Sequence, residues 1–332
     1  PPAGGGLPQY VALSADTEWA DLKDGIAEGG TVNLNGHALH VADCADFVSR
    51  NVSVTGDSGT FRVTVPANAT SVLSSGAAFS AKAHLVKDGP GTLVLSRVLS
   101  SLTGVTVAEG IVQYGTPSVF ENNGMTVEVK DGAALDVAGR SGNAVRYKIA
   151  GTGPDGNGAL RNTGGDVANN NSQMYGLELT ADATVTGGSQ GLIAPNYPVT
   201  TLALNGHTLT LNLNAGKSFW ICNTSSSEPG TVHVKSGVAH FHRNAVNLPN
   251  VDFVIDGAQA IFRQPGSSQA NPTVVKSVTL TNGGSSEEGQ NCTKMQDLNI
   301  LGSGTVGLQS HVKWVYVADT VLVSNETGNV FI

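Results

Sequence analysis

Four segments with the pattern Val-x-(acid or Ser)-Gly recur along the chain, each between runs of β-forming residues. They are Val107–Gly110, Val129–Gly132, Val234–Gly237 and Val254–Gly257. The first two glycines lie 22 residues apart, the last two lie 20 apart, and the interval of 105 between the pairs is five steps of 21. Such a period is typical of a solenoid, in which each repeat forms one coil and stacked coils bury a shared core. We predict that the four valines face this core and that the four glycines share one corner.

The composition supports an all-β fold. Charged residues make up 13% of the 332 residues, about half the usual share of roughly 25%. Short apolar alternations are bounded by Gly, Asn, Asp and Pro, which indicates strands and turns rather than long helices. We therefore predict a single-stranded right-handed parallel β-helix over residues 29–332, preceded by an arm and a helical cap over residues 1–28.

The charge pattern excludes two classes of partner. The net charge is -8 and Lys and Arg are not clustered, so we expect no nucleic-acid binding, which needs grouped cations. No apolar run approaches the roughly 18 residues of a membrane-spanning helix. Low charge and many small polar residues fit an exported protein, and we expect a secreted or bacterial cell-surface location.

The N-terminal segment contains a candidate cap for the open end of the core. Residues 1–10 are rich in Pro and Gly, and Asp16 can cap a short helix that places Trp19, Leu22 and Ile26 on one face. A first irregular strand is the alternative for the same residues.

A second internal similarity joins Leu34-Asn-Gly-His37 to Leu204-Asn-Gly-His207. Asn-Gly between apolar alternations is a strong hairpin signal because both residues tolerate positive φ. The same pair can also form a corner between two core-facing strands, and we favour the corner. The predicted corner glycines are Gly36, Gly110, Gly132, Gly206, Gly237 and Gly257.

Three cysteines are present: Cys44, Cys222 and Cys292. An odd count in a secreted protein leaves at least one thiol outside intramolecular disulfides. Cys222 and Cys292 lie 70 residues apart, about three coils, or roughly 15 Å along the stack. A disulfide needs Cα atoms within about 7 Å. A Cys222–Cys292 bridge is therefore possible only through looped-out residues, and buried thiols are the alternative.

The stretch Leu85–Gly115 resembles the autotransporter-associated β-strand repeat. Its first part is matched by Lys87, Gly89, Gly91, Thr92, Leu93, Leu95 and Ser96, and its second by Thr103, Gly104, Thr106, Val107, Gly110 and Val112. The Asn-Thr-Tyr segment usual between the parts is replaced by Arg97–Leu102. Thr31–Val41 and Gly151–Gly165 are similar to segments of large secreted β-helix proteins of bacteria. The resemblance implies an exported, passenger-like β-helix, a class defined by its fold and not by one activity.

Catalysis would need carboxylates brought together on one wall. Glu109 and Asp131 occupy equivalent positions in adjacent coils, about 4.8 Å apart along the stack, which a retaining glycosidase could use. Ser236 and Asp256 are predicted to occupy the same position further along. An acid before a corner glycine is also ordinary turn chemistry, and we favour that interpretation. We expect no catalytic residues.

Candidate ligand-binding residues are few. His233, His240 and His242 suggest a metal, but no Cys or carboxylate follows at a fixed ligand spacing. Asp155 and Asn157 in GPDGNG resemble a calcium loop without its full pattern, which favours a turn. Three tryptophans and four tyrosines could stack on sugars, although no one of them can be singled out: Trp19, Trp220, Trp314, Tyr147, Tyr175, Tyr197 and Tyr316. We expect no metal and no cofactor.

The leading functional hypothesis is an extracellular structural solenoid: a stalk, an adhesin segment or a fibre subunit. The competing class is a polysaccharide-binding or polysaccharide-degrading β-helix. The apolar end of the sequence predicts self-association, head to tail, with Pro1, Tyr10, Val330 and Ile332 as candidate contacts. A glycan or a host surface is the other expected partner.

Overall fold

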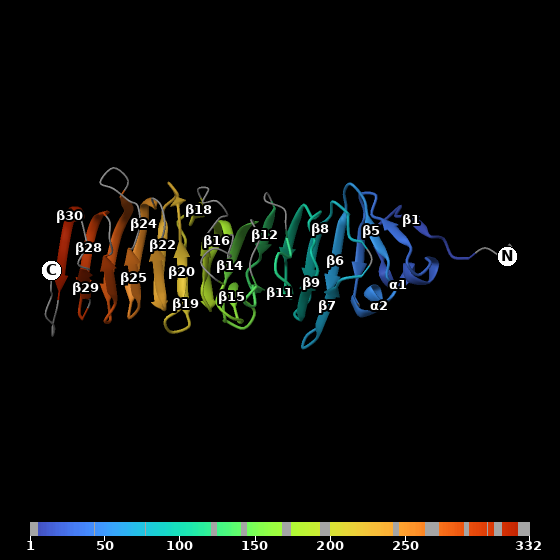
Figure 1. Ribbon diagram of the computed structural model, residues 1–332, viewed down its shortest axis with the longest axis horizontal. Helices are drawn as coiled ribbons and strands as arrows, with labels where there is room; N and C mark the ends of the chain where they lie inside the picture. The colour runs from blue at the N-terminus through green and yellow to red at the C-terminus, as the bar shows by residue number, and fades with distance from the viewer. Residues whose placement is uncertain are drawn as a thin grey trace.

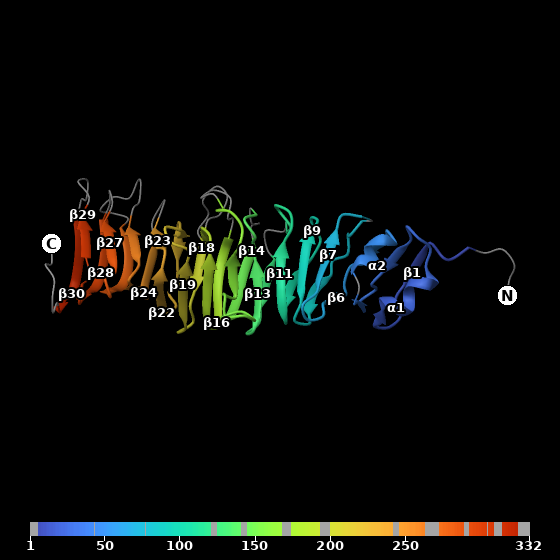
Figure 2. The same cartoon turned by 90° about the horizontal axis from the view of Figure 1, so that it is seen from below.

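The computed structural model describes residues 6–42, 44–76, 78–120, 125–140, 145–167, 174–192, 200–241, 246–262, 272–288, 292–303, 305–308 and 314–324. These residues form a parallel β-solenoid of about twelve coils. Figures 1 and 2 show an elongated rod with the first coils at one end and the last at the other. At a strand spacing of about 4.8 Å, the stack is roughly 55–60 Å long.

The first face of the rod is built from parallel strands of successive coils. Alternate side chains point inward, as in β6, where Phe61 and Val63 are buried between half-buried neighbours. The strands are β2 (Thr17–Glu18), β4 (Ala38–Val41), β6 (Thr60–Thr64), β8 (His84–Asp88), β10 (Gly104–Val107), β12 (Thr126–Val129), β14 (Val145–Gly151), β18 (Thr200–Ala203), β21 (Thr224–Ser225), and the first parts of β16 (Met174–Gly187), β24 (Asn247–Asp256), β26 (Thr273–Thr281), β28 (Cys292–Leu301) and β30 (Trp314–Ser324).

The second face follows the first across a corner. It contains the second parts of the five long strands, which bend from one face to the next, so both faces belong to one 21-stranded sheet of the described chain. Its other strands are β7 (Thr70–Ser74), β9 (Thr92–Ser96), β11 (Gly110–Tyr114), β13 (Ala133–Asp136), β15 (Leu160–Asn162), β19 (Thr208–Leu213) and β22 (Gly230–Ser236).

The third face has regular strands only near the two ends of the described rod. A 3-stranded sheet lies at the N-terminal end and a 6-stranded sheet in the C-terminal half. The strands are β1 (Tyr10–Ala12), β3 (Thr31–Asn33) and β5 (Ser53–Thr55), then β17 (Gln190–Leu192), β20 (Ser218–Ile221), β23 (Val238–Phe241), β25 (Gln259–Phe262), β27 (Ser285–Glu288) and β29 (Thr305–Leu308).

Both Asn-Gly pairs form corners and not hairpins. Asn35 and Asn205 have φ of 48° and 53°, and their glycines have φ of 86° and 83°. In each, the backbone N–H of the following histidine donates to the leucine before the asparagine, at 2.8 and 2.9 Å. The flanking strands then pair in parallel with neighbouring coils. Gly36 lies between the third and first faces, and Gly206 between the first and second.

The four repeated glycines occupy two corners, so the prediction of one shared corner is wrong. All four have positive φ, between 66° and 78°. Gly110 and Gly132 lie between the first and second faces, whereas Gly237 and Gly257 lie between the second and third. Both corners need a left-handed residue at the end of a core strand, and the same four-residue pattern satisfies either one.

One inward column of the second face runs through eleven coils. Its members pair in register from strand to strand, and all except the last are essentially fully buried. They are Leu93, Val112, Leu135, Leu160, Val185, Leu211, Val234, Ile255, Leu280, Ile300 and Val323.

The expectation for Val254 is also wrong, because this residue is half-exposed. Val107, Val129 and Val234 are buried as expected, the first two on the first face and Val234 on the second. In β22 the register shifts by one residue after Val234. The Val234–Gly237 segment therefore has one more residue between its inward side chain and its glycine than the Val254–Gly257 segment has. Ile255 therefore stacks on Val234, and Val254 pairs with the outward His233.

The N-terminal end of the core is capped by short helices: α1 (Trp19–Leu22), the 3-10 helix η1 (Lys23–Gly25) and α2 (Cys44–Ser49). Asp16 does not cap α1; its carboxylate accepts the backbone N–H of Ala38 at 2.8 Å, and the residue before the helix is Glu18. Because β1 and β2 pair with β3 and β4, sheet structure extends into residues 10–18.

A column of aromatic rings fills the core beneath this cap. Trp19, Phe47, Phe61 and Phe79 follow one another with centroid distances of 5.0, 5.4 and 5.2 Å. The Trp19 indole N–H also donates to the Asp46 carboxylate at 2.8 Å. The second helix therefore holds the first, and the pair covers the apolar end of the coils.

Only some of the predicted cysteine and terminal contact residues lie within the described residues. Cys44 and Cys222 are buried, while the side chain of Cys292 lies outside the described residues. Three register steps separate the coils of Cys222 and Cys292, so the proposed bridge stays a prediction that this separation disfavours. Pro1, Val330 and Ile332 lie outside the described residues as well. Tyr10 is 55% exposed and accepts a hydrogen bond from Asn33 at 2.8 Å.

The corner between the first and second faces offers a matched pair of glycine variants. A Cβ on Gly110 would lie 2.4 Å from the carbonyl oxygen of Gly91, whereas a Cβ on Gly132 would meet nothing within 4 Å. We expect Gly132→Ala to lower the free energy of unfolding by about 1–2 kcal/mol through its positive φ alone. Gly110→Ala should cost about 1–3 kcal/mol more through overpacking. Urea unfolding measures both, and equal losses would contradict this corner packing.

Candidate functional site

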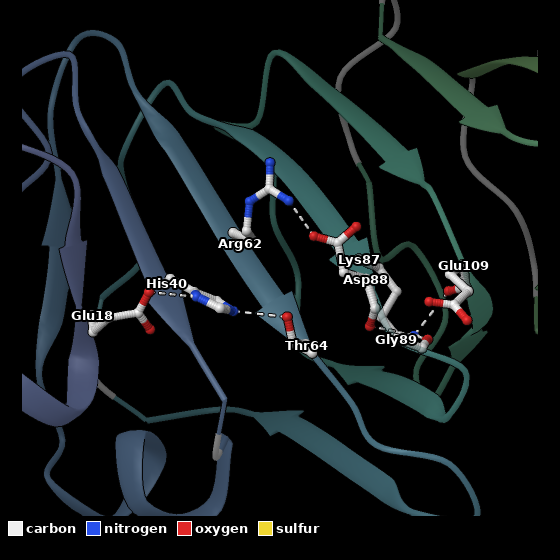
Figure 3. Close-up of polar contacts among 8 residues, drawn as sticks. All are labelled: Glu18, His40, Arg62, Thr64, Lys87, Asp88, Gly89 and Glu109. Carbon is white, nitrogen blue, oxygen red and sulfur yellow. Dashed lines mark hydrogen bonds and ion pairs between the residues drawn. The ribbon is translucent and has the colours of Figure 1, made fainter.

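Lys87 is a charged residue at a core position. It follows Val63 and precedes Val107 in an inward column of the first face, and it is fully buried. Its Nζ donates to the backbone carbonyls of Asp88, Gly89 and Glu109 at 3.0, 2.6 and 2.9 Å. Figure 3 shows the ammonium group directed at the corner where two coils meet. Of these three charge-assisted hydrogen bonds, the one to Glu109 ties Lys87 to the adjacent coil, and the other two hold the turn that follows it.

Close packing at this corner explains the glycines of the repeat-like stretch. A Cβ on Gly89 would lie 2.4 Å from the Val65 carbonyl oxygen, and one on Gly91 would lie 2.2 Å from that of Pro66. The two halves of the stretch form adjacent coils, since Lys87 pairs with Val107. The spacing of the motif thus follows from backbone contact between coils.

A carboxylate, an imidazole and a hydroxyl lie in line on the outer side of the first face. Glu18 Oε1 is 2.8 Å from His40 Nδ1, and His40 Nε2 is 2.7 Å from Thr64 Oγ1 (Figure 3). The hydroxyl, the imidazole and the carboxylate are arranged like a nucleophile, its base and the acid that orients the base. However, His84 makes the same contact with Thr106, at 2.8 Å, with the Glu128 carboxylate near enough to attract its charged form, so the arrangement is repeated along this face. We therefore assign these contacts to cohesion between coils.

The predicted acid pair keeps its arrangement in adjacent coils. Glu109 and Asp131 occupy the same corner in adjacent coils and are exposed. The backbone carbonyl of Glu109, and not its carboxylate, receives Lys87. Ser236 and Asp256 lie at the other corner, so the four positions do not form one row.

The histidines of the C-terminal half lie apart. His233 pairs with Asp256 at 3.2 Å. The pKa of the Asp256 carboxyl is lowered, most by a hydrogen bond from Asn282 and next by the one from His233. His240 stacks on Trp220 with a centroid distance of 4.1 Å, and His242 lies outside the described residues. Within the described ranges, no three His, Cys, Asp or Glu side chains are placed to hold a metal ion.

The candidate sugar-stacking rings are divided between core and surface. Trp19 and Tyr147 are buried, and Tyr147 shares a 3.0 Å hydrogen bond with Tyr114 inside the core. Tyr175 and Trp220 are half-buried, and Tyr316 is exposed. Tyr197 and the side chain of Trp314 lie outside the described residues.

A polar cleft of about 520 Å³ opens on the second face, across three consecutive coils. Arg161, Thr186 and Asn212 stack in register through it. The next column holds Asn162, Gly187 and Leu213. The lining is mostly polar, with amide, hydroxyl and charged groups beside apolar surface, and it consists of Asp155, Asn157, Arg161, Asn162, Thr163, Thr186, Gly187, Asn212, Leu213 and Asn214.

The cleft exists because one coil is longer than its neighbours. The coils from Val105 to Val127 and on to Tyr147 take 22 and 20 residues, whereas the coil from Tyr147 to Leu177 takes 30. Some of the extra residues form the loop 152–158 between β14 and β15, closed by a hydrogen bond from Gly158 N to the Thr152 carbonyl at 2.7 Å.

Two wall residues hold this loop over the face. Arg161 Nη1 donates to both carboxylate oxygens of Asp155, at 3.0 and 2.9 Å, and Thr186 Oγ1 donates to the Asn157 carbonyl. Burial alone would raise the pKa of Asp155, but hydrogen bonds from Asn157 and Arg161 lower it below its usual value. GPDGNG therefore forms a turn whose acid binds an arginine.

Sequence reasoning missed the cleft, Lys87 and the His40 contacts. The spacing could have indicated the His40 contacts, since Glu18 and Thr64 lie 22 and 24 residues from His40, one coil each.

Comparison with known families, with curated proteins and with solved structures found no match. The helices in the described part of the chain are all too short or too polar to cross a bilayer.

Because the ammonium group of Lys87 is buried, we predict that its contribution to the free energy of unfolding depends on pH. Burial, against the attraction of Glu109 and Asp88, lowers the pKa of Lys87 to about 8. Between pH 8 and 10.5 the unfolded chain then binds more protons at this site than the folded chain, so its contribution to stability rises with pH. From pH 7 to 10.5, wild type should gain up to about 3 kcal/mol relative to Lys87→Met.

Denaturant unfolding across this pH range measures the difference between the two proteins. Lys82→Met is the control, because Lys82 is exposed and pairs only loosely with Asp57, at 3.5 Å. The free energy of unfolding of Lys82→Met should differ from that of wild type by about the same amount across this pH range. A flat difference for Lys87→Met as well would contradict the burial of a charged ammonium.

Proposed function

We propose that this chain is a structural β-solenoid that works outside the cell, as a stalk, an adhesin segment or a subunit of a fibre. The observation that carries the proposal is the buried column from Leu93 to Ile300, which runs through ten coils in register. A continuous close-packed core resists bending and compression. Such a rod can hold a binding element at a distance from the surface that anchors it.

The outer wall supports the same proposal. Polar side chains on it link one coil to the next, as Thr64 and Thr106 do with histidines. Ion pairs such as Lys148–Glu178, at 3.2 Å, also join coils. The resemblance to autotransporter-associated repeats, on the residues given above, adds export to the proposal.

Self-association is part of the proposal and would use the last described strand. β30 pairs with β28 on one side. Val321 and Val323 continue inward columns of the second face, yet they are 54% and 40% exposed, and Leu322 is 47% exposed. Within the described residues β30 has a strand partner on this side alone, and an apolar edge strand is a template for pairing with another chain.

The assembly prediction is tested with Val321→Lys/Val323→Lys. Light scattering over a concentration series and electron microscopy should show growing oligomers or filaments for wild type and monomers for the variant, with unchanged circular dichroism. Val72→Lys, at a wall residue that is 43% exposed, is the control and should assemble like wild type. Monomeric wild type at high concentration would rule out assembly through this strand.

The location is tested separately, on intact producing cells. Antibody labelling and digestion by added protease should both reach the protein without permeabilising the cells. Protection from both reagents would refute the extracellular part of the proposal, whatever the outcome of the assembly experiment. A polysaccharide-binding role is the second candidate, favoured by the polar cleft.

A further inference from the structure

We propose that the cleft beneath the loop 152–158 binds a short segment of a neutral oligosaccharide. The inference rests on the second candidate function, polysaccharide binding, and it is independent of the stalk proposal because it concerns one place on the wall and not the rod as a whole. Inserted loops on a solenoid commonly carry its binding function, while the coils supply a rigid base.

The cleft lies over a rigid part of the wall. Gly187 has φ of 91°, and a Cβ there would lie 2.1 Å from the carbonyl oxygen of Asn162 in the adjacent coil. The backbones of the two coils are therefore in close contact at this position. The volume of about 520 Å³ is in the range of roughly 300–1,000 Å³ usual for small-molecule sites.

The floor of the cleft has an unmet hydrogen-bond donor. Arg161 is 7% exposed, and its Nε has no partner in the described part of the chain. A buried donor without an acceptor destabilises the fold, because it has lost its hydrogen bonds to water. A ligand oxygen on this floor, reached by a small shift of the loop 152–158, would supply the missing acceptor.

The charge of the cleft selects a neutral ligand. The Asp155 carboxylate, held by two hydrogen bonds, offsets the Arg161 guanidinium. The remaining polar groups at the opening are exposed amides and a hydroxyl: Asn157, Thr163, Asn212 and Asn214. An amide group can donate and accept, and the Asn212 oxygen already accepts one hydrogen bond from Ser236 at 2.8 Å, which leaves it one lone pair. This combination matches sugar hydroxyls, which donate and accept, better than it matches a carboxylate, sulfate or phosphate.

The direction of the cleft suits a chain of sugars. It crosses three coils, whose spacing of about 4.8 Å is close to the length of one hexose in an extended glycan. Successive sugar units would therefore meet successive coils, first at Arg161, then at Thr186 and finally at Asn212.

Heteronuclear NMR titration tests the proposal on the whole chain. The probes are neutral cello-, xylo-, manno- and malto-oligosaccharides of three to six units, with oligogalacturonates as acidic counterparts. We expect at least one neutral series to bind, with shifts centred on Asn157, Thr163 and Asn212. Asn212→Ala/Asn214→Ala should weaken binding at least about tenfold. Its circular dichroism and melting temperature should match wild type, since both residues are exposed.

The matched control is Asn299→Ala, an asparagine on the same face whose amide contacts Thr279 at 3.2 Å, away from the cleft. It should bind within twofold of wild type. Three results would overturn the proposal: no binding of any neutral series, equal binding by the double variant, or binding of oligogalacturonates alone.

Discussion

Stacking in register is the constraint on which the whole structure depends. Each coil must place its inward side chains on those of the coil before it, because parallel strands about 4.8 Å apart leave no room for an offset. The column through Val234, Ile255 and Leu280 holds even where β22 contains an extra residue. The chain absorbs the irregularity in a bulge and keeps the core continuous.

The corners are the places where this constraint becomes most severe. Backbones of successive coils approach so closely at Gly89, Gly91 and Gly110 that a Cβ would lie 2.2–2.4 Å from a carbonyl oxygen. The carbonyls gathered there need donors, and Lys87 supplies three hydrogen bonds from inside the core. A buried charge is tolerated at this point because the backbone surrounds it with acceptors.

A local departure from the coil length produces the one large polar cleft described on the rod. Because the coils above and below must remain in register, the extra residues of the long coil have to leave the wall as a loop. Arg161 and Thr186 hold that loop against the face, and at Gly187 the backbones of two coils are in close contact beneath it. A rigid stack can therefore carry a binding site without any change in its core.

The sequence by itself determined the solenoid, the corners at Asn35–Gly36 and Asn205–Gly206, and an apolar cap around Trp19. These features follow from side-chain alternation and from residues that tolerate positive φ, and both are local properties. Only the tertiary structure decided which corner each glycine occupies, why Val254 faces outward and how Lys87, His40 and Arg161 find their partners. Those outcomes depend on the length of every intervening coil, and one residue more or less moves a side chain to the other face.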